Sequence, residues 1–195
     1  MKRNFHLYYI GISLFWIGVF AIMLGHYNNL GTYPFWQYTI SRQVGWTRWS
    51  EITFAAVNVI AGILVYLFVR KNISHWSLSK NLERLLYGAL VLFFLTSFIP
   101  YDPTLGTVLA HQIVAFLMLA LAGIFVLAIL LRNKPWKFTL NSIIGISMMI
   151  VSAVSLIMFA FFLDTIWNVI FFVESFYILA FYIFLPTVPA KDLLE

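Results

Sequence analysis

Six residues of chemically useful types stand out because the chain around them is so apolar. They are Ser41, Arg42, Asn58, Asp102, His111 and Glu174. A serine, a histidine and an aspartate are the residue types of a nucleophile, its base and the group that orients the base. Ser41, His111 and Asp102 are therefore candidate catalytic residues. No G-x-S-x-G turn surrounds Ser41, so this interpretation depends on residue type alone.

Arg42, Asn58 and Glu174 are candidate ligand-binding residues. The planar guanidinium of Arg42 suits a lipid phosphate or a carboxylate. Glu174 lies ten residues beyond Asp164, which is about 15 Å of helix rise and places its carboxyl deep in an apolar segment. An ionised carboxylate is costly there, so we expect Glu174 to be protonated, paired or next to a wet cavity. Asn58, seven residues beyond Glu51, is expected to face the same interior.

Each candidate also has a purely structural explanation. Asp102 is followed by proline, and such a pair favours a turn because the Asp side chain can bond its own backbone further along. His111 begins an apolar segment, where an interfacial imidazole is easily hydrated. Ser41 and Arg42 can simply anchor a loop. A metal site made by Asp102, His111 and Glu174 lacks the spacing of an established motif, so we assign no metal ligands and leave the cofactor open.

The composition makes lipid the solvent for much of the chain. Of its 195 residues 63% are hydrophobic and 10% are charged, and the mean hydropathy is +0.93. A soluble domain is about half apolar and about a quarter charged, and a chain this small cannot bury so much apolar surface in one aqueous core. The absence of cysteine excludes disulfides and thiolate chemistry. We expect a single all-α membrane domain over residues 1–195.

Six segments approach the ~20 apolar residues that span a bilayer. They lie near 5–24, 51–69, 85–100, 109–131, 139–162 and 166–186. These segments predict a bundle of six transmembrane helices. The first segment is long, rich in Tyr and Trp, and lacks a small-residue cleavage site, so we interpret it as a retained span rather than a signal peptide. Gly11, Gly18 and Gly25 recur every seven residues, a spacing that lets a neighbouring helix approach closely.

The distribution of basic residues predicts the orientation. With the N-terminus inside, only Arg42 and Arg48 of the twelve Lys and Arg residues fall in outer loops. This positive-inside bias places both termini in the cytoplasm. It also accounts for the net charge of +5, so no nucleic-acid partner is expected. A cysteine-free chain rich in Phe, Ile and Leu suits a prokaryotic inner (plasma) membrane.

The first outer loop, about residues 25–50, is long and aromatic. Tyr and Trp favour the membrane–water boundary. We therefore expect this loop to lie on the outer leaflet as a lid or a re-entrant piece, with a simple aromatic belt as the alternative. The other outer loops are tight turns, around Asp102 and Asp164.

The order of several short motifs carries a family resemblance. The motifs are Ile40-Ser41 with Gly45, Phe98-Ile99-Pro100 with Asp102, His111 at the start of the fourth segment, and Glu174 in the sixth. This order resembles a family of six-span prokaryotic membrane proteins, domain of unknown function 998. It is also similar to the related group of DRAM-type autophagy modulators and a GPI-anchor lipid-remodelling factor. The resemblance covers nearly the whole chain, implies a six-helix bundle with outward-facing polar residues, and departs at Arg42 and Ile99.

Three functions from different classes are compatible with this pattern. The first is binding of a lipid or other amphiphile in an outward-facing polar pocket. Lipid hydrolase or acyltransferase activity would extend it, so whether the chain is an enzyme stays open. The second is a small transporter or channel that uses Glu174. The third is a non-catalytic subunit of a membrane complex. The expected partners are membrane lipids and either another membrane protein or a second copy of the chain.

Overall fold

The computed structural model describes residues 5–30, 40, 44, 47–76, 78–99, 105–132, 140–161 and 170–188. The α-helices are α1 (Phe5–Leu30), α3 (Arg48–Asn72), α4 (Lys80–Thr96), α5 (Val108–Arg132), α6 (Leu140–Phe161) and α7 (Ile170–Phe184). Short 3₁₀ turns, η2 (Ile73–His75) and η4 (Leu185–Thr187), follow α3 and α7. No described residue lies in a strand, so the predicted all-α class is confirmed.

Three helices are long and apolar enough to cross a membrane: Phe5–Tyr27, Arg48–His75 and Val108–Leu131. The apolar parts of α6 and α7, Ile143–Val154 and Val173–Thr187, are shorter. Large apolar side chains are exposed along the outside of the helices, as expected where lipid is the solvent. The helices are compatible with an integral membrane protein, and the crossing by all six helices stays a prediction.

The helix α4 begins earlier and ends earlier than the predicted span 85–100. Ser79 caps its start by accepting a hydrogen bond from the backbone N–H of Leu82, so the polar turn that follows is helical too. The helix ends at Thr96, before Pro100. The residue before a proline avoids the helical conformation, which favours an end in this region.

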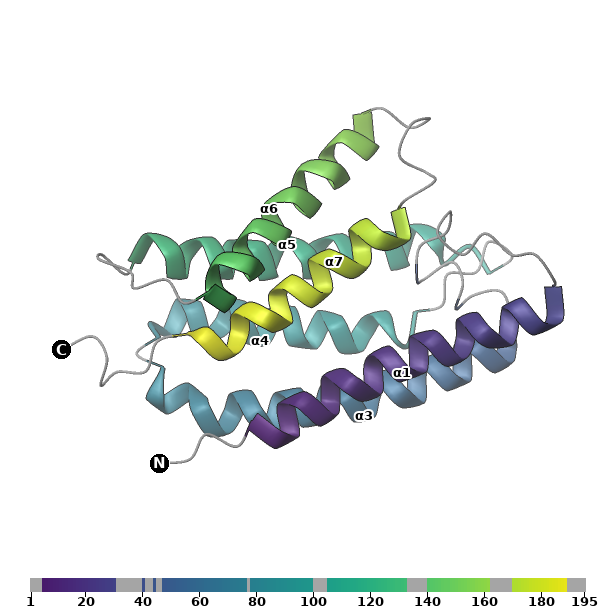
Figure 1. The fold of residues 1–195 in the computed structure, drawn as a ribbon, viewed down its shortest axis with the longest axis horizontal. Helices are drawn as coiled ribbons and strands as arrows, with labels where there is room; N and C mark the ends of the chain where they lie inside the picture. The colour runs from purple at the N-terminus through teal and green to yellow at the C-terminus, as the bar shows by residue number, and fades with distance from the viewer. Residues whose placement is uncertain are drawn as a thin grey trace.

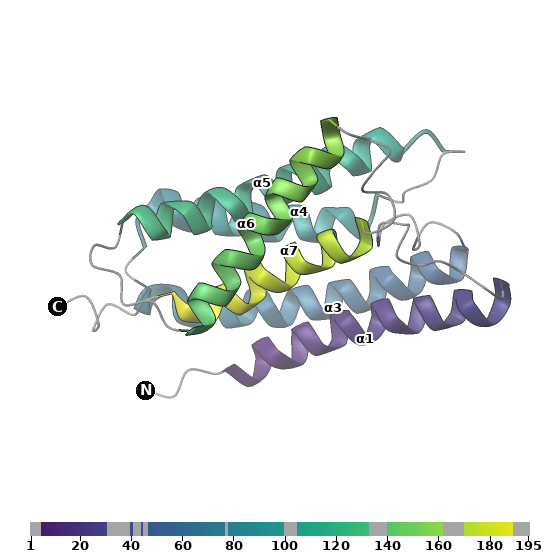
Figure 2. The ribbon, with the colours of Figure 1, turned by 45° about the horizontal axis from the view of Figure 1, so that its top comes forward.

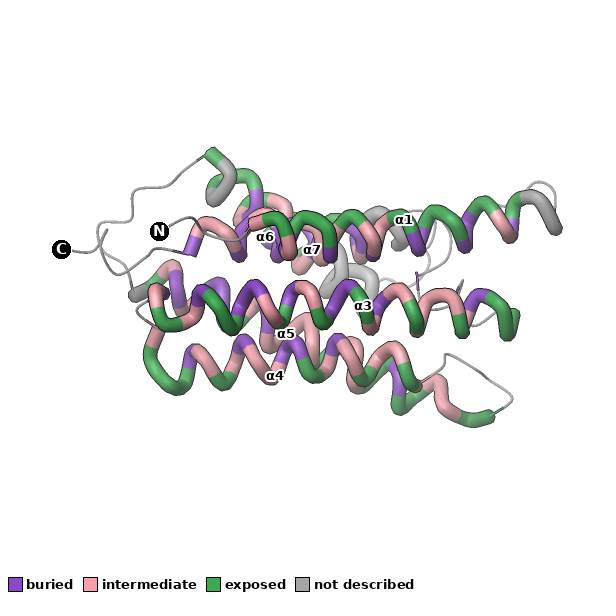
Figure 3. Tube along the Cα trace, turned by 90° about the horizontal axis from the view of Figure 1, so that it is seen from below, coloured by how far each residue is buried: buried purple, intermediate pink, exposed green. Residues whose placement is uncertain are grey.

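The helices α1 and α3 pack along their length, as the glycine spacing predicted (Figure 1, Figure 3). A Cβ atom added at Gly11 would lie 2.9 Å from the carbonyl oxygen of Ala61, and one at Gly18 would lie 2.6 Å from Cγ1 of Val57. At Gly25 the neighbour is the Trp49 ring, at 3.0 Å. The missing side chains therefore let the two backbones approach closely, and the prediction is confirmed.

The helix ends gather at two opposite ends of the bundle. Figure 1 shows the first turn of α1, the α3–α4 junction and the last turn of α7 at one end. We call this the inner end, following the predicted topology, and the opposite end the outer end. Tyr8 on α1 donates a hydrogen bond to the carbonyl of Tyr182 on α7, which joins the first and last helices near the inner end.

The helices α4 and α5 form a second close pair, and α6 packs extensively on α7. A Cβ atom at Gly145 of α6 would lie 3.1 Å from the carbonyl oxygen of Ala180 of α7. Figure 2 shows α6 and α7 inclined to α1 and α3. The backbones of α5 and α7 approach each other at fewer places than either approaches that of its own partner.

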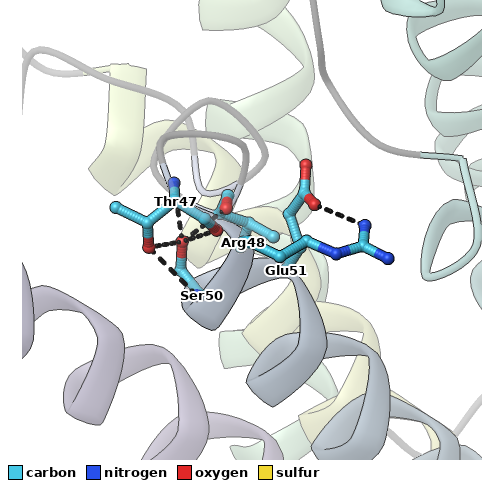
Figure 4. Close-up of polar contacts among 5 residues, drawn as sticks. Thr47, Arg48, Ser50 and Glu51 are labelled. Carbon is cyan, nitrogen blue, oxygen red and sulfur yellow. Dashed lines mark hydrogen bonds and ion pairs between the residues drawn. The ribbon is translucent and has the colours of Figure 1, made fainter.

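A capping box fixes the outer end of α3 (Figure 4). The hydroxyl of Thr47 accepts a hydrogen bond from the Ser50 N–H at 3.1 Å, and Ser50 Oγ accepts one from the Thr47 N–H at 3.2 Å. Ser50 Oγ also lies 2.6 Å from the carbonyl oxygen of Val44, to which it donates. The same hydroxyl therefore caps α3 and ties it to the preceding segment.

Candidate functional site

A cavity lies between α4, α5 and α7. Its volume is about 40 Å³. The lining residues are Ala89, Leu90, Phe93, Met118, Leu119, Ala122, Tyr177, Ile178, Phe181 and Tyr182. Small-molecule pockets are mostly apolar. The apolar lining of this space, the three-helix cavity, suits an apolar ligand or the apolar part of an amphiphile.

The cavity wall includes one tyrosine whose hydroxyl is already bonded. The Oη atom of Tyr177 donates to the carbonyl oxygen of Leu119 at 2.6 Å. A Cβ atom at Gly123 would lie 2.7 Å from the same Oη. Glycine at position 123 therefore makes room for the phenol, which joins α5 to α7 across the wall of the cavity.

Polar residues lie outward of the apolar lining on all three helices. Positions three, four or seven residues apart share a helix face. Ser97 is four residues beyond Phe93, and Glu174 is four residues before Ile178. His111 is seven residues before Met118, on the same face of α5. Because α4 runs outward while α5 and α7 run inward (Figure 1), these three residues mark the same end. We call Ser97, His111 and Glu174 the polar rim.

Glu174 ties α7 to the segment that precedes α3. Its Oε2 atom accepts a hydrogen bond from the backbone N–H of Ile40 at 2.9 Å. Ile40 and Val44 are both buried, and they belong to one core cluster with Val19 and Ile22 on α1. These positions of the predicted outer loop therefore pack into the bundle, as a re-entrant piece would.

Asn58 supports the rim from α3. Its side chain is 1% exposed, and Nδ2 donates to Ser97 Oγ and, at 3.4 Å, to the carbonyl oxygen of Phe93. Its Oδ1 atom has no hydrogen-bond partner among the described residues. The sequence placed Asn58 in a shared interior with Glu174. In the structure Asn58 lies behind Ser97 and beside Phe93, a residue of the cavity wall.

His111 joins the start of α5 to the end of α4. Its Nδ1 atom bonds the carbonyl oxygen of Ile99. A carbonyl can only accept, so Nδ1 carries the hydrogen, and in the neutral ring the lone pair is then on Nε2. The catalytic hypothesis would give this Nδ1 hydrogen to Asp102. In the structure the Nδ1 hydrogen is donated to the backbone carbonyl of Ile99, which lies three residues before Asp102 in the sequence.

Large apolar side chains are buried one helical turn inward of the cavity lining, in the same core cluster. Leu86 on α4, Phe125 on α5 and Leu185 after α7 are each 0% exposed. Each follows the cavity lining by three or four residues on the inward side, so each shares its face. We call Leu86, Phe125 and Leu185 the floor of the cavity.

Three predicted site residues, Ser41, Arg42 and Asp102, lie outside the described residues. Their proposed roles stay predictions. The Glu174–Ile40 bond does bring α7 next to the residue that precedes Ser41 in the chain. Within the described ranges, no group of three His, Cys, Asp or Glu residues is placed to hold a metal ion.

Sequence reasoning missed Ser97 and the cavity itself. Ser97 ends an apolar segment, where a serine ordinarily indicates only a helix terminus. Its spacing from Phe93 was a usable signal, but the meaning of that face depends on which helices cover it.

Comparisons of this chain with protein-family models, with curated proteins and with solved structures found no match.

Proposed function

We propose that this chain is an integral membrane protein that binds a lipid or another amphiphile. The apolar tail would occupy the three-helix cavity and the head group would lie at the polar rim. The observation that supports this proposal is the change from apolar to polar side chains toward the same end of all three lining helices. An amphiphile has the same change along its length.

The rim favours a head group that donates hydrogen bonds. A carboxylate offers about four lone-pair positions, and within the described residues Glu174 accepts one backbone N–H. A ligand hydroxyl or amine could donate to the remaining positions. Such a group would lose its bonds to water on entering the membrane, so pairing at the rim offsets that cost.

The floor favours binding over transport. A transporter or channel based on Glu174 needs a polar path from the rim to the inner end. Instead, fully buried apolar side chains lie one helical turn inward of the cavity lining, at Leu86, Phe125 and Leu185. A ligand entering from the rim would therefore stop within the bundle.

Hydrolysis or acyl transfer is a second candidate function, and His111 supports it. A general base needs a nitrogen with a lone pair and a fixed ring orientation. The bond from Nδ1 to Ile99 supplies the orientation and leaves the lone pair on Nε2. This candidate fails if His111→Ala, Ser41→Ala and Asp102→Asn variants that fold leave the lipid composition of the membrane unchanged.

The proposal includes the membrane in which the chain lies and its orientation there. We place the chain in a prokaryotic inner membrane with six spans and both termini in the cytoplasm. Arg70, Lys71, Lys80 and Arg84 support this orientation, because all four are exposed near the inner end and basic residues favour the cytoplasmic side. Thiol labelling of a cysteine that replaces Ser79, carried out from one side of the membrane, tests the orientation directly.

Lipid binding is tested by isolating the chain in lipid nanodiscs and identifying retained amphiphiles by mass spectrometry. We expect the unmodified protein to retain a distinct amphiphile. Ser97→Ala and Glu174→Gln should reduce its amount, because each removes part of the rim. Ser13→Ala is the matched control, since Ser13 is exposed on α1. If all four proteins retain the same bulk lipids in the same ratio, the proposed function is wrong.

A further inference from the structure

The helices α3 and α4 bring two arginines to the same level near the inner end. The two helices are antiparallel neighbours (Figure 3), and the rings of Tyr66 and Tyr87 lie 6.0 Å apart between centroids. Arg70 lies four residues inward of Tyr66, and Arg84 lies three residues inward of Tyr87. The charge of Arg70 acts on the Tyr87 hydroxyl, as this register requires. We call Arg70 and Arg84 the arginine pair.

Both arginines lie on the side of their helix that faces lipid. Both are exposed, as are Ile63, seven residues before Arg70, and Val91, seven residues beyond Arg84. Residues seven apart share a helix face. Ile63 is 46% exposed and Val91 is 56% exposed, and lipid is the solvent for such side chains. The outside of the α3–α4 pair is therefore basic at the arginine pair, aromatic one turn outward and aliphatic beyond that.

This order of side chains follows the order of groups in an anionic phospholipid. The planar guanidinium of arginine suits a phosphate, which it can bond through two N–H groups at once. Tyrosine favours the membrane–water boundary. Ile63 lies about 10 Å of helix rise outward of Arg70, deep enough to meet an acyl chain when the phosphate is at the arginine pair.

The local charge also favours an anion. Lys80 is exposed four residues before Arg84, so it adds a third cation to the same face. The acid in this part of α4 is Glu83, which is half-buried. Among the described residues, no ion pair joins it to either arginine. Three cations against one carboxylate leave this surface positive.

We propose that the arginine pair binds the phosphate of an anionic phospholipid, whose acyl chains lie along the outside of α3 and α4. A soluble phosphate would use only the basic side chains, whereas Ile63 and Val91 continue the surface outward for an acyl chain, so we assign a lipid. The site lies at the opposite end of the bundle from the polar rim. The inference therefore does not depend on the proposed function.

Two adjacent residues separate this site from a general attraction of the inner end for anions. Arg70→Gln and Lys71→Gln each remove one positive charge from an exposed position of α3. A Cβ atom at Gly62 would lie 2.7 Å from Phe94 of α4, so Gly62 marks the side of α3 that faces α4. Lys71 is nine residues beyond Gly62, or about two and a half turns, and lies on the opposite side. Lys71→Gln is therefore the matched control.

The experiment uses the full chain in detergent micelles with equal amounts of phosphatidylglycerol and phosphatidylcholine that carry the same acyl chains. Native mass spectrometry measures the ratio of the two bound lipids. We expect the unmodified chain to prefer phosphatidylglycerol. Arg70→Gln and Arg84→Gln should each lower the preference about fivefold, because a basic residue near an anionic lipid surface contributes about this factor. Lys71→Gln should leave the preference close to that of the unmodified chain.

Three results would overturn the inference. The first is an unmodified chain that binds both lipids equally. The second is an equal loss of preference in Arg70→Gln and Lys71→Gln, which would mean a diffuse attraction without a site. Arg84→Gln gives the same comparison from α4 even if Arg70→Gln fails to fold. The third is displacement of the bound lipid by inorganic phosphate at the same concentration, which would identify the ligand as a soluble phosphate. Each result leaves amphiphile binding in the three-helix cavity untouched.

Discussion

The inner and outer halves of this bundle are built differently. The largest fully buried side chains among the described residues belong mostly to the inner half, for example Tyr8, Phe68 and Trp76. Buried polar side chains such as Asn58 and His111 belong to the outer half. Dense apolar packing stabilises a fold, whereas cavities and buried polar groups reduce stability. The comparison indicates that the inner half contributes more to stability, and the polar rim of the proposed ligand site lies in the outer half.

The largest expected effect is in the inner half. The Phe68 ring is fully buried and lies 4.6 Å, between ring centroids, from Tyr8 and 5.8 Å from Trp76. Phe68→Ala should lower the free energy of unfolding by about 3–5 kcal/mol, because it leaves a cavity in a packed core. Reversible unfolding in mixed micelles measures this. Phe116→Ala, at an exposed position of α5, is the control, and an equal loss there would contradict the comparison.

The α1–α3 contact gives the next largest effect. Gly18→Leu adds a side chain on α1 whose Cβ atom alone would lie 2.6 Å from Cγ1 of Val57. We expect a loss of about 1–3 kcal/mol from overpacking, measured by the same unfolding assay. Ala21→Leu on the exposed face of α1 should change stability little. If Gly18→Leu changes stability as little as Ala21→Leu does, α1 and α3 do not approach each other as closely as described.

In the outer half, Glu174 separates a structural bond from binding. Glu174→Leu leaves the Ile40 N–H without its acceptor and should cost about 1–3 kcal/mol. Glu174→Gln keeps an acceptor oxygen, so stability should change less while ligand retention falls. Hydrogen exchange at the Ile40 amide checks the difference, with faster exchange expected in Glu174→Leu alone. Equal exchange in both variants would mean that the Glu174–Ile40 bond does not hold the segment.

The smallest effect is expected at the outer end of α3. Thr47→Ala removes the N-cap and should cost about 1 kcal/mol. The neighbouring ion pair joins Arg48 Nη1 to Glu51 Oε2 at 3.0 Å, and the Arg48 side chain is 82% exposed. Arg48→Gln should therefore change stability by less than about 0.5 kcal/mol. A reversed order in thermal unfolding would mean that the cap is not formed.

The sequence by itself determined the solvent and the helices. An apolar fraction this high requires lipid around the chain, and the long apolar runs indicate where the helices lie. The glycine spacing on α1 also predicted a close neighbour, because only the absence of a side chain permits such contact. The boundary of α4 was harder, since hydropathy does not register the polar turn that Ser79 caps.

Only the tertiary structure decided what the polar residues contact. Local spacing assigns a residue to a helix face, but which helix covers that face depends on packing between distant segments. The bond of Glu174 to Ile40 joins positions 134 residues apart, and nothing local in the sequence specifies it. The cavity arises for the same reason, because α5 and α7 each pack against another partner and leave a gap that only three helices together define.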